Sequence, residues 1–266
     1  MINKKNTLYL LITFLITYGS WFTVSFVLGQ ESLKGPLFIL YILGGFGPTI
    51  SAFLIKRFYA DRMEFKCFLK QIIHVKVNVG WYIFILAVPL AQTFLPYFIN
   101  SIITGKQQLI VLQPVYMLFA MIPVMIIGGG LEELGWRGVF LPELLKKQSV
   151  LVSTIIVSII WSVWHIPLWF IKGVSQYGSN FMEFAVAVVG LSLLLSIIYI
   201  KTESIFMCIL FHSLVNSYHA IFSTPCSDTL STIISISSKL IICIAIFIAF
   251  LVLNKKKTFE NNLKVT

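Results

Sequence analysis

Three short polar segments interrupt a strongly apolar chain, and each carries side chains that could take part in hydrolysis. The first segment, EELGWR, holds Glu132, Glu133 and Arg137. Glu133 and Arg137 are four residues apart, so on a helix they share a face and can form an ion pair, which offsets part of the cost of burying both charges. Glu132 points about 100° away around the helix axis and has no designated cation. A carboxylate in that position suits the work of a general base.

The other two segments contribute histidines. WSVWH places Trp161 four residues before His165, where the aromatic ring can shield the imidazole. FHSLVNSYHA places His212 and Asn216 on one helical face, to which His219 nearly returns. Strongly polar groups inside membrane helices are rare and usually face an interior cavity. The three segments together therefore predict a polar site inside the protein.

Each segment also has a structural explanation when it is taken alone. The glutamates could cap an amphipathic helix at the membrane surface. His165 could belong to a belt of interfacial aromatic residues, and His212 could begin a polar seam that joins helices. Their joint occurrence on three separate apolar segments is better explained by hydrolysis, which needs a base for water and donors for the oxyanion.

Two routes of water activation stay open. In the first, Glu132 and His165 hold and deprotonate the water, while His212 and Asn216 donate hydrogen bonds to the oxyanion. In the second, Glu132, His165 and His212 bind a zinc ion that lowers the pKa of the water to about 7. A covalent route is disfavoured, because the sequence has no G-x-S-x-G and no cysteine beside a histidine of these segments.

The composition predicts a protein with many membrane-spanning helices. Of 266 residues, 58% are hydrophobic and 11% are charged, where globular chains have roughly 25% charged residues. A spanning helix needs about 20 mainly apolar residues. We expect an all-α bundle of about eight spans in a single domain, 1–266, whose catalytic core is 118–222. The apolar stretches are approximately 7–28, 36–55, 80–103, 109–130, 150–171, 181–200, 203–222 and 230–253.

The net charge of +10 reports membrane topology. With the N-terminus inside, sixteen of the twenty Lys and Arg residues fall on the inner side, and only Lys34, Lys106, Lys172 and Lys239 fall outside. This split obeys the positive-inside rule and predicts that both termini are cytosolic. No basic cluster remains for a nucleic acid. The four cysteines are scattered and indicate neither a disulfide framework nor a zinc ribbon.

EELGWR, WSVWH and HSLVN resemble, in order and separation, the three motifs of the CPBP family, which comprises type II CAAX prenyl proteases and related bacteriocin-processing enzymes. The likeness covers roughly 118–222, and GPTISAFL in the second apolar stretch is similar to the family's early segment. The resemblance implies an eight-helix intramembrane endopeptidase whose site opens to the cytosolic side.

The resemblance also assigns roles to residues. It implies that Glu132 and His165 activate water and that His212 and Asn216 form the oxyanion hole. Supporting roles fall to Glu133, Arg137 and Trp161, of which Trp161 replaces the phenylalanine that is usual in the family. His219 is an addition without an assigned role.

The substrate and cofactor follow from the resemblance only in outline. The expected partners are membrane lipid and a peptide or lipidated protein, either a prenylated CAAX protein or a bacteriocin or pheromone precursor. Either no cofactor or zinc is expected. The compact chain favours a bacterial protein, located in the plasma membrane. Two other functions stay open: a bacteriocin self-immunity protein, which would need no intact motif, and a proton-coupled transporter, in which inverted repeats would be expected.

Overall fold

The computed structural model describes residues 4–28, 33–105, 109–223 and 228–263, with the side chains beyond residue 254 left out. Helices make up most of these ranges, and the predicted all-α class is confirmed. Two strands of two residues, β1 (Ile110–Val111) and β2 (Phe222–Ser223), pair in antiparallel fashion. The long or apolar helices are α1 (Lys4–Leu28), α2 (Gly35–Gly45), α3 (Gly47–Tyr59), α5 (Val79–Thr104), α6 (Met117–Ile127), α9 (Val150–Trp164), α10 (Phe181–Thr202), α11 (Ile205–Ile221) and α12 (Thr229–Leu263).

Each of the eight predicted apolar stretches contains a helix, although 109–130 becomes helical only at Met117 and 36–55 is broken at Phe46. Within the described residues, six helical segments are long and apolar enough to cross a membrane, and the bent pair of α2 and α3 adds a seventh if it forms one span. The remaining stretch forms α11, which has only 17 residues. Because about 20 residues are needed to cross the hydrocarbon core, α11 is short for a complete span. The number of spans and the side of the termini stay predictions.

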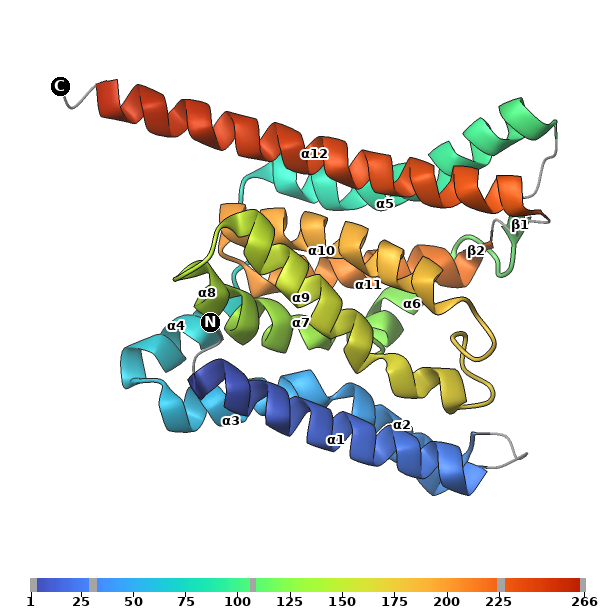
Figure 1. Ribbon diagram of the computed structural model, residues 1–266, viewed down its shortest axis with the longest axis horizontal. Helices are drawn as coiled ribbons and strands as arrows, with labels where there is room; N and C mark the ends of the chain where they lie inside the picture. Colours follow the sequence, from blue (N-terminus) through green and yellow to red (C-terminus); the bar gives the residue numbers. More distant parts are fainter. Residues whose placement is uncertain (1–3, 29–32, 106–108, 224–227, 264–266) are drawn as a thin grey trace.

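The helices form three groups across the molecule (Figure 1). α5 and α12 lie side by side at one edge, and α1, α2 and α3 lie at the opposite edge. Between them are α6, α9, α10 and α11, with α11 in contact with α6 and α10. The polar segments identified in the sequence lie in this middle group, where neighbouring helices enclose them.

A bend of 51° separates α2 from α3. Only Phe46 lies between them, and Pro48 is at the start of α3, where a proline needs no amide hydrogen-bond partner. The glycines beside the bend also allow close contact with α1: a Cβ atom at Gly44 would lie 2.4 Å from the ring of Trp21. Small residues permit close contact between membrane helices, and here close packing and a break occur together.

The chain is irregular around the first polar segment. α6 ends at Ile127, and three glycines follow it. A 3₁₀ turn η1 (Gly130–Glu132), a single helical turn α7 (Glu133–Gly135), a π-helical turn η2 (Trp136–Phe140) and α8 (Leu141–Leu145) then follow in succession. Turns of π-helix occur often at functional sites. This succession turns Glu132 and Glu133 toward different neighbours.

Candidate active site

Glu133 and Arg137 form the ion pair that their spacing predicts. Arg137 Nη1 lies 2.9 Å from Glu133 Oε2 and 3.2 Å from Oε1, and both side chains are fully buried. Arg137 Nη2 also donates to Ser192 Oγ on α10 at 2.9 Å. The guanidinium faces the ring of Trp161, with Cζ 4.8 Å from the ring centroid. Several partners thus compensate the buried charges.

Glu133 has a second partner that the sequence did not indicate. His212 Nδ1 lies 2.9 Å from Glu133 Oε1, which joins α11 to α7. Because a carboxylate paired with Arg137 accepts hydrogen bonds, Nδ1 is the donor in this contact. Glu133 therefore fixes the orientation of the imidazole and leaves Nε2 of His212 directed elsewhere.

Nε2 of His212 and the amide of Asn216 converge over the backbone of Gly129. A Cβ atom at Gly129 would lie 2.6 Å from Asn216 Nδ2 and 3.3 Å from His212 Nε2. Only a glycine leaves this space open, since any other side chain would begin where the two donors point. The pair can thus reach a single oxygen atom, as an oxyanion hole requires.

Glu132 lies beside the same space as His212 and Asn216. Its Oε2 accepts a hydrogen bond of 2.8 Å from Trp161 Nε1 on α9. The ring of Trp161 also meets His212 edge to face, with centroids 5.3 Å apart. Phenylalanine has no N–H, so Trp161 makes a contact with Glu132 that the residue usual in the family cannot make. Trp161 thus connects the first polar segment to the second.

His165 ends α9 and has a defined tautomer. Its Nδ1 lies 2.8 Å from the carbonyl oxygen of Trp161. A carbonyl only accepts, so Nδ1 donates and Nε2 of the neutral ring keeps its lone pair. The rings nearest to His165 are Trp164 at 4.5 Å and Phe184 at 4.9 Å between centroids. Trp161 lies 6.0 Å away, so it contributes less shielding than its position in the sequence suggests.

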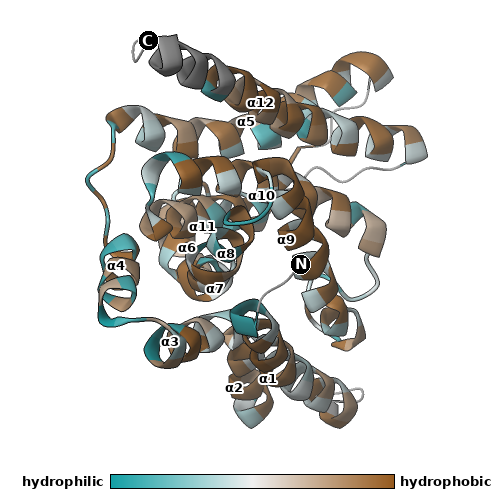
Figure 2. Ribbon diagram, turned by 60° about the vertical axis from the view of Figure 1, so that its left-hand side comes forward, coloured by the Kyte–Doolittle hydropathy of each residue, from teal (hydrophilic) through white to brown (hydrophobic). Residues whose placement is uncertain are grey.

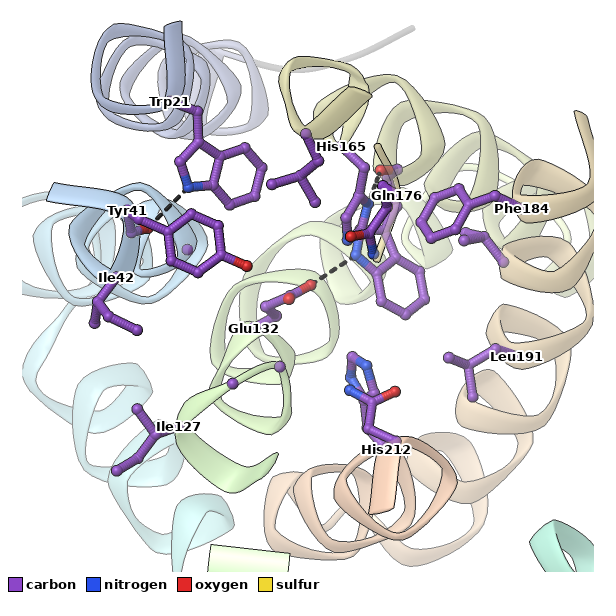
Figure 3. Close-up of a pocket in the computed structure, with 17 residues that line it drawn as sticks. Trp21, Tyr41, Ile42, Ile127, Glu132, His165, Gln176, Phe184, Leu191 and His212 are labelled. Atoms are coloured by element: carbon purple, nitrogen blue, oxygen red, sulfur yellow. Dashed lines mark hydrogen bonds between the residues drawn. The ribbon is translucent and has the colours of Figure 1, made fainter. Parts of the chain in front are cut away.

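One cavity of about 180 Å³ joins these groups (Figure 3). Glu132, His165, His212 and Asn216, named from the sequence, all line it, together with Trp161. Figure 3 shows Glu132, His165 and His212 around a common space, although they come from η1, the end of α9 and α11. Glu133 and Arg137 lie behind this wall and are not among the lining residues.

Other lining residues could not be identified by sequence motifs. Tyr41 of α2 and Gln176, from the loop between α9 and α10, add polar groups to the wall. Figure 3 shows the Tyr41 ring directed into the cavity. A tyrosine in an apolar stretch and a glutamine in a loop carry no signal of such a role. His219 is exposed and does not line the cavity, even though it is two helical turns from His212.

The possible zinc ligands do not form a recognisable metal site. Among the described residues, no group of three or more His, Cys, Asp or Glu side chains is placed to hold a metal ion. Nδ1 of both His165 and His212 is engaged by the protein, which leaves one ring nitrogen on each for the cavity. Zinc binding by these residues stays a prediction, and metal removal tests it.

Comparisons with known proteins agree with the motifs. Residues 114–218 match the family model described as type II CAAX prenyl endopeptidase Rce1-like. The chain is also 25% identical over 225 residues to CAAX prenyl protease 2 of the archaeon Methanococcus maripaludis. This alignment covers 79% of this chain and 82% of that protein. The matched region contains EELGWR, WSVWH and HSLVN, and the cavity-lining residues from Ile127 to Asn216. The chain is therefore similar to the Rce1-like type II CAAX prenyl endopeptidases over the region that carries its polar segments. Its several helices that are apolar enough to cross a membrane indicate an integral membrane protein.

Proposed function

We propose that this protein cleaves a peptide bond of a membrane-associated substrate by direct attack of a water molecule held by Glu132 and His165. The observation that carries the proposal is the single cavity lined by Glu132, His165, His212 and Asn216. Peptide hydrolysis in a membrane needs a base beside a water molecule and donors beside the carbonyl oxygen. Residues of both kinds line this cavity.

Glu132 suits the base. Trp161 occupies Oε2, so Oε1 is the oxygen left for the water. The lone pair of His165 Nε2 can accept the second hydrogen bond of the same water. As the water attacks the carbonyl carbon, Glu132 takes one of its protons and then passes that proton to the leaving amine.

His212 and Asn216 suit the oxyanion. The Asn216 amide has an N–H to donate in any protonation state of the site. His212 already donates Nδ1–H to Glu133, so donation by Nε2 requires the doubly protonated ring, for which Glu133 is the counter-ion. Loss of one such donor typically lowers kcat by about 10²–10³.

The test is cleavage of membrane-associated peptides by the purified protein in liposomes. Glu132→Gln and His212→Gln should remove cleavage, because they take away the base and an oxyanion donor. Two matched controls should retain it: Glu64→Gln changes a glutamate on α4 that pairs with Lys5, and His219→Gln changes the exposed histidine on α11. Processing by Glu132→Gln at the wild-type rate would remove the proposed mechanism.

A further inference from the structure

The cavity lies toward one end of the bundle. Its lining includes Trp21 in the last third of α1, Leu168 in the 3₁₀ turn η3 (Ile166–Phe170), and Phe184 in the first turn of α10. Gln176 comes from the loop that joins η3 to α10. In Figure 1 this loop lies at the same end as β1 and β2, away from the N-terminus and the C-terminus. The cavity end is therefore the end opposite both termini.

Basic residues gather at the other end of the bundle. Figure 2 shows hydrophilic residues on α3 and α4 (Arg62–Ile72) there. Among the described residues, the basic ones near that end are Lys4, Lys5, Lys56, Arg57, Arg62, Lys66, Lys70, Lys76, Lys146, Lys147 and Lys201. The loops at the cavity end carry Lys34 and Lys172 in the described part of the chain. The asymmetry seen in the sequence thus becomes an asymmetry between the two ends of one structure.

The positive-inside rule turns this asymmetry into an orientation. Lys and Arg in short loops remain on the cytosolic side, where anionic lipids also attract them. The end with α4 is then cytosolic, and the loop that contains Gln176 is outside. We propose that the catalytic cavity lies in the extracytoplasmic half of the membrane and receives its substrate from that side. This is the opposite of the cytosolic opening that the family resemblance implies.

The orientation indicates a class of substrate. This inference about the substrate rests on the proposed endopeptidase function. A prenylated protein is anchored in the cytosolic leaflet through a modified C-terminal cysteine, so its scissile bond would be across the membrane from this cavity. An exported precursor, or a peptide that spans the membrane, can present a bond in the outer half. The wall is mainly apolar, with Ile42, Leu168 and Leu191 beside the polar groups. We infer that the substrate is a membrane-inserted or exported peptide, cut near its outer membrane boundary.

The orientation can be measured without catalysis. Cys67 is exposed on α4 and serves as a native reporter of the basic end, whereas Cys208 and Cys243 are buried. Tyr177→Cys, at an exposed position in the loop after η3, reports the cavity end. Cys226, which lies outside the described residues, is replaced by serine throughout, and Cys67 by serine in the Tyr177 variant.

Spheroplasts are treated with a membrane-impermeant maleimide before and after permeabilisation. The proposal predicts that Tyr177→Cys is labelled in intact spheroplasts and that Cys67 is labelled only after permeabilisation. Labelling of Cys67 in intact spheroplasts, with Tyr177→Cys protected, would overturn it. A variant that does not fold is recognised because buried Cys208 and Cys243 then become labelled.

A second experiment tests the class of substrate. Two pools of single-span reporter proteins carry the same randomised hexapeptide, one pool at the outer boundary of the span and the other at the inner boundary. Wild type should cleave members of the outer pool only, and Glu132→Gln should cleave neither. Cleavage confined to the inner pool would contradict the inferred substrate class. Cleavage of neither pool, with Tyr177→Cys labelled from outside, would refute the endopeptidase function and leave the orientation supported.

Discussion

Trp161→Phe isolates the hydrogen bond between the second and first polar segments. The substitution keeps an aromatic ring beside His212 and Arg137 but removes the N–H that lies 2.8 Å from Glu132 Oε2. We expect Glu132 to leave its catalytic rotamer more often. The loss should therefore appear in kcat, with KM little changed, because the bond positions the base and does not hold the substrate.

The size of the effect follows from the chemistry of the bond. A hydrogen bond to a charged group contributes about 1.5–3 kcal/mol. Trp161 is buried, but the indole leaves room for a water molecule when phenylalanine replaces it, and that water can donate to Glu132 in its place. We therefore expect a loss near the lower limit, about 1.5 kcal/mol, which corresponds to roughly a tenfold decrease in kcat.

The assay is steady-state cleavage of a quenched fluorescent peptide in liposomes, with Trp169→Phe as the control. Trp169 Nε1 donates to the carbonyl of Ser179, also at 2.8 Å, and Trp169 does not line the cavity. This control removes an indole N–H bond of the same length without touching Glu132, so its kcat should stay close to that of wild type. An unchanged kcat for folded Trp161→Phe would refute the positioning role of the bond.

Three further predictions concern the groups around the cavity. Gly129→Ala should lower kcat/KM by about 10²–10³ in the same cleavage assay, because its Cβ would lie 2.6 Å from Asn216 Nδ2 and block an oxyanion donor; wild-type kinetics would show that nothing binds there. Arg137→Met should lower the free energy of unfolding by about 3–5 kcal/mol, since it removes the buried arginine that pairs with the Glu133 carboxylate; chemical unfolding in detergent measures this, and adding Glu133→Gln should recover part of the loss. Incubation with a chelator should leave cleavage unchanged if Glu132 activates the water without a metal, whereas loss that added zinc restores would assign that step to zinc.

Local periodicity was enough to predict several features correctly. Runs of about 20 apolar residues identified the helical segments, since a membrane leaves helices as the main way to satisfy the backbone. The i, i+4 spacing gave the Glu133–Arg137 pair. The placement of His212 and Asn216 on one face also predicted their convergence, because one helix carries both residues.

Contacts between distant segments could not be predicted in the same way. Glu133 and His212 are far apart in the sequence, and their contact depends on how α7 packs against α11. The bond from Trp161 to Glu132 likewise depends on the irregular turns after α6. Periodicity describes one helix at a time. It therefore gives the helix face on which a side chain lies but not the neighbouring helix that this face contacts.

The end of the bundle at which the cavity lies also could not be predicted from the sequence. Motif residues alone do not say which end of the bundle they approach. The end became evident from Trp21 and Gln176, which line the cavity without belonging to any motif. Loop residues of this kind are recognised only when the packing of several helices is known.

The most direct test of the central claim is whether Glu132 and His165 act on one water molecule. The measurement is a double-mutant cycle in kcat/KM for Glu132→Gln, His165→Gln and the double variant, on one peptide in liposomes. If both groups hold the same water, the double variant should be about as active as the poorer single variant, because either change already loses that water. Losses that multiply in the double variant would show that the two residues act independently and would contradict the account.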